Sequence, residues 1–154
     1  MIKKNSLSQN LNVVAIQMNS TDDKKENFNQ VLEIIKRTNK SHIDLMVLPE
    51  VFNFRSNALF QRDAAETCAD ETVDWLKKTA LTYQMHIIGG SITEVGVKNK
   101  VYNTSFAISP NGNIIGTYRK MHLFDVKLDK TSIKESNHFL AGNKPEIIDK
   151  APSG

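Results

Sequence analysis

The chain has 154 residues, 40% of them hydrophobic and 24% charged, which is the composition of one globular domain with a core. Its 20 basic and 17 acidic residues are dispersed and leave a net charge of +3, so only the basic isoelectric point favours a nucleic-acid binder. The N-terminus lacks the apolar segment of a signal peptide, no apolar run is long enough to span a membrane, and one cysteine excludes an internal disulfide. We therefore expect a cytoplasmic protein without nucleic-acid or membrane partners.

The first half of the chain alternates between strand and helix patterns. Residues 11–18 predict a mostly buried strand, and residues 20–23 supply N-cap side chains for a helix. A second strand is expected over residues 44–49, where unbroken apolar character indicates cover on both faces. Residues 50–69 have no clean period and indicate a long connection, and a second helix is expected after Asp70. The apolar stripes of the two helices are Phe28, Val31, Leu32 and Ile35 in the first, and Val73, Leu76, Ala80 and Tyr83 in the second.

The second half of the chain is dominated by strand patterns. Residues 86–92 predict a third strand, and strands over residues 102–109 and 113–123 flank a Pro-Asn-Gly-Asn turn, which is a strong hairpin signal. Residues 125–144 are polar and irregular, and residues 146–149 begin another strand. This order of elements predicts an α/β fold in which helices cover a sheet.

No internal repeat or linker divides the chain. We therefore expect one domain over residues 11–154, preceded by a disordered or extended N-terminus at residues 1–10. Residues 151–154 form a turn signal with nothing after it, and we interpret this ending as an interruption of the domain.

Two charged residues, each at the end of an apolar strand-like run, are candidates for catalysis. Glu50 follows a buried strand and a proline, and desolvation at the mouth of an apolar layer favours the protonated carboxyl, which suits a general base. Lys120 lies among large, partly apolar neighbours, and a lysine that projects into a pocket stabilises the oxyanion of a tetrahedral intermediate. Taken singly, Glu50 also fits a solvated loop glutamate, Lys120 an edge-strand charge, and Glu135 a surface residue.

Five motifs in register resemble the carbon–nitrogen hydrolase family, also called the nitrilase superfamily. They are Leu48-Pro-Glu-Val-Phe-Asn53, Gly89-Gly-Ser-Ile92, Val101-Tyr-Asn-Thr104, Tyr118-Arg-Lys-Met-His-Leu-Phe-Asp125, and Glu135-Ser-Asn137 before Gly142. Within the family they are most similar to the omega-amidase and deaminated-glutathione amidase branch. The resemblance begins at Leu11 and covers nearly the whole chain.

The resemblance implies an α-β-β-α sandwich, incomplete here because the chain matches the N-terminal half of the family domain or slightly more. It also implies a Glu-Lys-Cys triad, in which Glu50 is the general base, Lys120 stabilises the oxyanion, and Glu135 orients the lysine and the substrate. A thiolate attacks the amide carbonyl, ammonia leaves, and water hydrolyses the thioester, with no metal or organic cofactor. The implied substrates are small linear amides, such as the terminal amide of a dicarboxylic acid monoamide, and the family suggests a homo-oligomer.

The nucleophilic cysteine is the point at which this chain departs from the family pattern. In the family the cysteine lies one strand beyond the segment that resembles residues 146–149, and this chain ends first. Cys68 lies upstream of the lysine beside Glu66, Asp70 and Glu71, whose charges oppose thiolate formation, so we expect a small buried residue and not the nucleophile. The alternative to an amidase is a catalytically inactive truncated product that acts only through binding or association. Without later strands, we expect an exposed apolar edge and face and a marginally stable or aggregating chain.

Three histidines, His86, His122 and His138, have spacings that fit no common pattern of metal ligands, and no metal site is predicted. We expect His86 to be a core histidine at the start of a buried strand. We expect His122 to point away from Lys120, because alternate residues of a strand face opposite sides.

Overall fold

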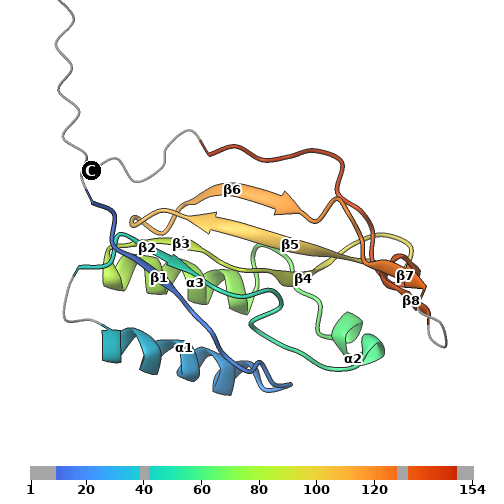
Figure 1. Cartoon of the computed structure of the whole chain (residues 1–154), viewed down its shortest axis with the longest axis horizontal. Coiled ribbons are helices and arrows are strands. Elements are labelled where there is room, and N and C mark those ends of the chain that lie inside the picture. The colour runs from blue at the N-terminus through green and yellow to red at the C-terminus, as the bar shows by residue number, and fades with distance from the viewer. Residues whose placement is uncertain (1–9, 39–41, 128–131, 149–154) are drawn as a thin grey trace, which may run out of the picture.

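The computed structural model describes residues 10–38, 42–127 and 132–148 (Figure 1). Its strands are β1 (Val13–Ala15), β2 (Leu45–Val47), β3 (His86–Ile88), β4 (Ile92–Val95), β5 (Val101–Ile108), β6 (Ile114–Arg119), β7 (Asp125–Lys127) and β8 (Ser132–Lys134). Its helices are α1 (Lys24–Thr38), α2 (Ala58–Asp63), α3 (Glu71–Tyr83) and the short 3-10 helix η1 (Glu135–Asn137). The expected N-terminal segment, apart from residue 10, and the turn at residues 151–154 lie outside the described residues.

Six of these strands form one mixed sheet, in the order β1, β2, β3, β5, β4, with β6 paired to the other edge of β5. The strands β1, β2 and β3 are parallel, and β5 is antiparallel to β3, β4 and β6. The strand β6 therefore runs in the same direction as β2 and β3, so the carboxyl ends of these three strands lie at one edge of the sheet. Ligands of open α/β sheets bind outside this edge. The strands β7 and β8 form a separate antiparallel pair.

The helices α1 and α3 pack on the same face of the sheet (Figure 1), and the hydrophobic core lies between them and the strands. The stripes predicted for both helices are confirmed, and Phe28 of α1 stacks on Trp75 of α3 with ring centroids 4.6 Å apart. Full burial of one such apolar side chain contributes about 1.5–3 kcal/mol. The buried core residues include Phe28, Val31 and Ile35 of α1, Val73, Leu76 and Ala80 of α3, and Met46, Ile87, Phe106 and Ile108 of the sheet.

Carboxylate side chains fix the beginnings of both long helices. Asp23 Oδ1 accepts hydrogen bonds from the backbone N–H groups of Lys25 and Glu26 at 2.8 and 3.0 Å, which confirms the predicted N-cap of α1. At the start of α3 the buried Glu66 accepts a hydrogen bond from the backbone N–H of Thr72 at 2.7 Å. The segment between α2 and α3 is thereby joined to the first turn of α3.

The opposite face of the sheet carries no helix in the described part of the chain. Side chains alternate along a strand, so Leu45, Val47 and Ile88 point away from the core and are only half-buried. Val13 of β1 is 51% exposed. The expectations of a mostly buried first strand and of a second strand covered on both faces are therefore wrong, because both helices lie on one side.

The strand predicted over residues 86–92 is interrupted and becomes β3 and β4. Gly90 has φ of +53°, and a Cβ atom at this position would lie 1.9 Å from the carbonyl oxygen of Pro49. Only glycine fits both the conformation and the close approach. The break lets β3 and β4 pair with opposite ends of the same edge of β5.

The long connection predicted over residues 50–69 contains one short helix, α2. Gln61 of α2 donates a hydrogen bond to Thr93 Oγ1 on β4 at 2.8 Å. Because contacts of this kind are made between distant segments, the local period of the sequence does not predict the helix.

Three expectations for the last part of the chain are corrected by the structure. The strand predicted over residues 113–123 ends at Arg119, so that Lys120 lies just beyond it. The segment expected to be irregular, residues 125–144, contains the β7–β8 pair. Residues 146–148 form no strand, and Asp149 lies outside the described residues.

Candidate active site

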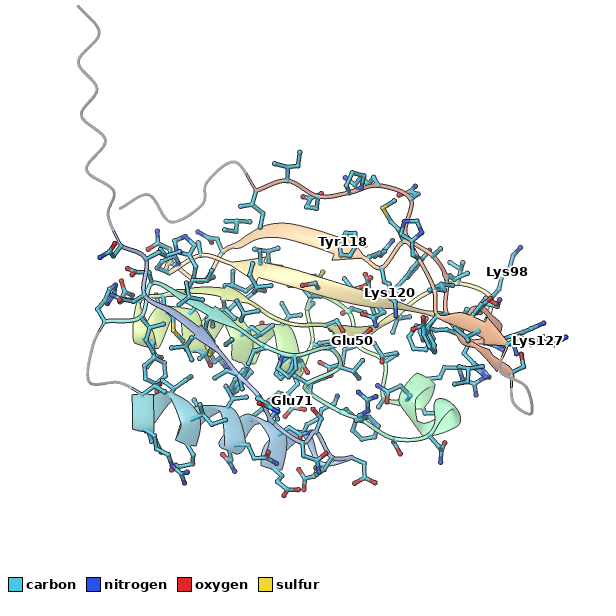
Figure 2. The ribbon with its side chains drawn as sticks, in the orientation of Figure 1. Glu50, Glu71, Lys98, Tyr118, Lys120 and Lys127 are labelled. Carbon is cyan, nitrogen blue, oxygen red and sulfur yellow. The ribbon has the colours of Figure 1, made fainter. Side chains whose placement is uncertain are left out.

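Glu50 and Lys120 are 70 residues apart in the sequence and meet at the carboxyl-terminal edge of the sheet (Figure 2). Glu50 follows β2 and Lys120 directly follows β6, and these two strands run in the same direction. Lys120 Nζ lies 3.3 Å from Glu50 Oε1. The triad that the family resemblance implies requires these two charged groups to lie close together, and the structure places them within about one hydrogen-bond length of each other.

The backbone around Glu50 is held by the turn between β3 and β4. Gly90 lies against the carbonyl oxygen of Pro49, and Ser91 Oγ accepts a hydrogen bond from the backbone N–H of Val51 at 2.9 Å. Val51 has φ of +52°, which is a strained conformation for a β-branched residue. Strained backbone of this kind persists only where its surroundings enforce it, and it is frequent at functional sites.

Glu135, the third candidate, is brought to the same lysine by the β7–β8 pair and η1. Lys120 Nζ lies 3.2 Å from Glu135 Oε1 and 3.0 Å from Glu135 Oε2. The backbone N–H of Phe124 also donates a hydrogen bond to Glu135 Oε2 at 2.6 Å. The lysine therefore contacts two carboxylates that come from distant segments of the chain.

The charge state of Lys120 follows from these contacts. Its side chain is 27% exposed, and this partial burial acts to lower the pKa of Lys120. Hydrogen bonds to Glu135 and Glu50, together with the charges of both carboxylates, outweigh that effect and raise the pKa above the usual 10.5. Lys120 is therefore cationic at neutral pH, which is the state that stabilises a developing oxyanion.

The two glutamates differ in which oxygen atoms are engaged. Both oxygens of Glu135 contact Lys120, and one also accepts the hydrogen bond from Phe124. Glu50 Oε1 contacts Lys120 and accepts a hydrogen bond from Asn103 Nδ2 at 2.7 Å, whereas Glu50 Oε2 has no partner among the described residues. The Glu50 side chain is 58% exposed, so the expectation of a desolvated carboxylate is wrong for the described part of the chain.

These side chains open into a hollow of about 680 Å³. This volume is within the range of sites for small molecules. The sequence interpretation missed Asn103 and Arg55 as members of the site, although Asn103 lies in one of the family-like motifs. The sequence does contain a signal for Asn103. Asparagine is depleted in strands, so its presence within a predicted strand indicates a special role. The polar residues that line the hollow include Glu50, Arg55, Asn103, Lys120, Lys134, Glu135 and His138.

Cys68 lies away from this arrangement. It is exposed, so the expectation of a buried residue is wrong, and it is not among the residues that line the hollow. Its segment precedes α3, whereas the hollow is bounded by the ends of β2 and β6 and by β8. The structure therefore does not bring this thiol to Lys120.

The histidines are placed differently from the sequence expectations. His86 is half-buried and not a core residue, and His122 lies beyond the end of β6, so the alternation of strand side chains does not apply to it. Within the described residues no group of three or more His, Cys, Asp or Glu side chains is arranged to hold a metal ion. Among the helices in the described ranges, none is long and apolar enough to cross a membrane.

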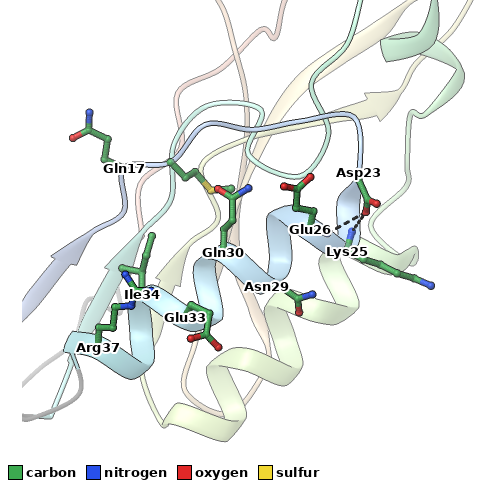
Figure 3. Close-up of a pocket in the computed structure, with 10 residues that line it drawn as sticks. Gln17, Asp23, Lys25, Glu26, Asn29, Gln30, Glu33, Ile34 and Arg37 are labelled. Atoms are coloured by element: carbon green, nitrogen blue, oxygen red, sulfur yellow. Dashed lines mark hydrogen bonds between the residues drawn. The ribbon is translucent and has the colours of Figure 1, made fainter.

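A second hollow lies along α1 (Figure 3) and is lined by side chains of that helix, most of them polar, together with Gln17, Met18 and Asp23. Asp23, at one end of it, is the N-cap of the helix. Glu33, further along, pairs with Lys36 on the exposed surface at 2.8 Å. The described residues of this hollow include no cation held between two carboxylates.

The residue before Lys120 forms a separate cluster with Glu94. Arg119 Nε and Nη2 donate hydrogen bonds to the two oxygens of Glu94 at 2.7 Å each, and Thr104 Oγ1 donates to Glu94 Oε2 at 2.6 Å. The guanidinium lies 4.1 Å from the centroid of the Tyr102 ring. Desolvation acts to raise the pKa of Glu94, but the hydrogen bonds from Arg119 and Thr104 outweigh it and lower the pKa below 4.5. This cluster joins β4 to β6 across β5.

The sheet and its helices match solved structures of the nitrilase superfamily. The crystal structure of Nit3 from Saccharomyces cerevisiae gives a TM-score of 0.73 at 30% identity over 87% of this chain and 49% of that chain. The NitFhit protein of C. elegans gives a TM-score of 0.76 at 26% identity over 86% of this chain and 33% of that chain. The expected fold class is thus confirmed: an α/β fold of the nitrilase type, present over part of its length.

The carbon-nitrogen hydrolase family matches residues 12–151, and the chain belongs to this family. The Nitrilase homolog 2 of Dictyostelium discoideum is 33% identical over 87% of this chain and 42% of its own length. The omega-amidase NIT3 of Saccharomyces cerevisiae is 34% identical over 93% of this chain and 52% of its length. A deaminated glutathione amidase of Synechocystis is 34% identical over 84% of this chain and 49% of its length. The chain therefore spans about half the length of these relatives.

Proposed function

We propose that this chain carries the glutamate and lysine groups of an amidase site that hydrolyses non-peptide C–N bonds in small linear amides. The observation that supports the proposal is the position of Lys120 Nζ, 3.3 Å from Glu50 and 3.0 Å from Glu135, at a hollow of small-molecule size. Relatives named omega-amidase and deaminated glutathione amidase support the same reaction class.

In this proposal Glu50 Oε2 is the general base. It takes the proton of a thiol as the sulfur bonds to the amide carbonyl carbon, and Lys120 stabilises the resulting oxyanion. The C–N bond then breaks, and Glu50 returns the proton to the leaving nitrogen, which departs as ammonia. Glu50 next takes a proton from a water molecule as the water oxygen adds to the carbonyl carbon of the thioester. The C–S bond breaks, the carboxylic acid is released, and the proton returns to the sulfur.

Glu135 has a different task in this proposal. Both of its oxygens contact Lys120 and one also accepts the Phe124 N–H, so, unlike Glu50, it has no oxygen without a partner. It holds the ammonium group toward the hollow and keeps it charged. We therefore assign Glu135 to orientation of the lysine and Glu50 to proton transfer.

The thiolate is supplied in this proposal from outside residues 1–154. The chain has one cysteine, and Cys68 is exposed on a segment that does not line the hollow. The Glu-Lys pair alone polarises a carbonyl but provides no covalent route.

Arg55 supports a substrate that carries a carboxylate. It lines the hollow with Glu50 and Lys120, and its guanidinium makes no hydrogen bond or ion pair with the described residues. A carboxylate at the far end of a substrate would pair with it through charge-assisted hydrogen bonds. The terminal amide of a dicarboxylic acid monoamide fits this charge, with the amide at Lys120 and the acid at Arg55.

The test is ammonia release at neutral pH from succinamate-type and ketoglutaramate-type amides. We expect no turnover from the 154-residue chain alone, since loss of a nucleophile leaves a rate lower by orders of magnitude. We expect turnover when the polypeptide encoded downstream of codon 154 is joined to the chain or added to it, a preparation called here the completed amidase. The completed amidase should keep its rate when Cys68→Ser is introduced.

Two outcomes would contradict the proposal. Robust turnover by the chain alone that Cys68→Ser abolishes would overturn the placement of the nucleophile. No ammonia release from any preparation would support the alternative, a non-catalytic chain that acts through binding or association, for which the helix-free apolar face is the available surface.

A further inference from the structure

Asn103 lies beneath the catalytic pair, on the central strand β5. Its Nδ2 donates a hydrogen bond to Glu50 Oε1 at 2.7 Å, and its backbone carbonyl accepts a hydrogen bond from the backbone N–H of Lys120 at 2.8 Å. One residue thus contacts both members of the pair. We propose that Asn103 is a positioning residue that holds the Glu50 carboxylate by Oε1 and so leaves Oε2 as the atom that exchanges protons.

The relative strength of the contacts made by Glu50 supports this assignment. The ion pair with Lys120 is 3.3 Å long, and the Glu50 side chain is 58% exposed. An ion pair in such a position contributes little to stability, because solvent screens it. The bond to Asn103 is shorter and comes from a side chain that is 6% exposed. A short hydrogen bond from a buried donor to a charged group is stronger than a screened surface ion pair, so we assign the positioning of the carboxylate to Asn103 and not to Lys120.

The chemistry of the amide group makes the contact directional. A carboxylate oxygen only accepts hydrogen bonds, so the amide nitrogen of Asn103 must be the atom that faces it. β5 pairs with β4 on one edge and with β6 on the other at this position, which leaves the Asn103 backbone little freedom. Support from a rigid element is what a site for proton transfer requires, because small displacements reduce the rate strongly.

This inference rests on the proposed amidase function for its catalytic meaning, but its structural part is tested without any activity. The measurement is the NMR titration of the Lys120 side chain, assigned with Lys120→Met, in the 154-residue chain. If Asn103 holds Glu50 beside the lysine, Asn103→Leu releases the carboxylate and the pKa of Lys120 falls by about one unit, the size of losing one nearby opposite charge. Any substitution at this position keeps the backbone bond to Lys120, so the effect must pass through Glu50.

Two further variants make the result unambiguous. Glu50→Gln should produce the same fall, and Asn103→Leu combined with Glu50→Gln should produce no further fall. If Asn103→Leu does not fold, Asn103→Ala adds no bulk and serves in its place. The matched control is Thr104→Val, a buried neighbour on β5 that contacts Glu94 and not Glu50, and it should leave the titration of Lys120 unchanged.

The activity measurement uses the completed amidase. Asn103→Leu should lower kcat by about 10- to 100-fold with little change in KM, since general-base catalysis contributes about 10²–10⁴-fold. An unchanged or raised pKa of Lys120 in a folded Asn103 variant, where Glu50→Gln lowers it, would overturn the inference. If the titration responds as expected while no preparation releases ammonia, the positioning role stands and the amidase proposal fails.

Discussion

Arg119 and Lys120 are neighbours in the sequence, and each pairs with carboxylate groups, yet the two clusters are built differently. Arg119 engages both oxygens of Glu94 at 2.7 Å, and Thr104 completes the bonding of that carboxylate. Lys120 engages two carboxylates at 3.0 to 3.3 Å, and Glu50 retains an oxygen without a partner among the described residues. Both carboxylate oxygens of Glu94 therefore have partners in the first cluster. In the second cluster one oxygen of Glu50, a residue that lines the hollow, is left to accept a further hydrogen bond.

This difference is the one we expect between an arrangement that stabilises a fold and one that performs the chemistry proposed above. A guanidinium that binds a carboxylate through two parallel hydrogen bonds has fixed geometry and cannot lose its proton. An ammonium is a compact charge that contacts several oxygen atoms at once and can turn toward a new one. We therefore expect substitutions at Arg119 to act on stability and substitutions at Lys120 to act on catalysis.

The largest effect is expected for Lys120→Met in the completed amidase. Loss of the group that stabilises the oxyanion should lower kcat by about 10²–10³-fold. The free energy of unfolding should change little, because the lysine is partly exposed. The assay is ammonia release, with Lys127→Met on β7 as the matched control (Figure 2). Equal activity in the two variants would remove Lys120 from the mechanism.

Arg119→Ala should act on stability instead. Glu94 is only 12% exposed, and without Arg119 it keeps one hydrogen bond, from Thr104. We expect the free energy of unfolding to fall by about 2 kcal/mol, the usual cost of leaving a largely buried charged group under-bonded. Urea denaturation measures it, with Arg62→Ala as the control, because the pair of Arg62 with Asp63 is exposed and 3.5 Å long. A loss no greater than that of the control would contradict the prediction.

A smaller and more selective effect is expected at Arg55. In the completed amidase Arg55→Leu should raise KM for an amide that carries a carboxylate by about tenfold, the effect of losing about 1.4 kcal/mol of binding. The kcat value should remain nearly constant, because Arg55 is assigned to binding and not to the reacting atoms. The check is a comparison with an uncharged amide of similar length. If KM rises equally for both amides, Arg55 does not bind the substrate carboxylate.

The contributions of the two clusters to the free energy of unfolding should be lost at opposite ends of the pH range. These changes are the smallest effects that we expect. The pKa of Glu94 is lowered from 4.5, so its contribution to stability is complete above 4.5 and is lost as the pH falls through the lower folded value. The pKa of Lys120 is raised from 10.5, so its contribution is complete below 10.5 and is lost as the pH rises through the higher folded value. Denaturation curves against pH should lose part of the acid slope in Glu94→Gln and part of the alkaline slope in Lys120→Met. A change at the wrong end in either variant would refute the assignment.

Glu50 and Lys120 were accessible from the sequence because each lies at the end of a strong strand pattern, whereas Glu135 was accessible only through the family-like motif. The apolar runs before Glu50 and Lys120 predict strands, and the family-like motifs around them predict that the two side chains meet. The helical stripes at Val31 and Leu76 likewise predict the face that packs on the sheet, and both are fully buried. Local periodicity and short motifs are sufficient for these features.

The features that escaped prediction all depend on contacts between distant segments. The division of one apolar run into β3 and β4 depends on Gly90, which must pass close to Pro49. The β7–β8 pair is tied to the site through Glu135, which directly follows β8 and whose carboxylate contacts the lysine that follows β6. The role of Asn103 depends on the register of β5 against β6, which places it beside Lys120. No local period of the sequence contains this information.

The contact between Glu50 and Lys120 also bears on when the site forms during folding. A contact that spans 70 residues requires closure of a long loop, and the entropy lost is recovered only after the intervening strands have paired. The register places β3 and β5 between β2 and β6, so all four strands must be joined before the two charges meet. We therefore expect the contact between the lysine and the glutamate to form late in folding.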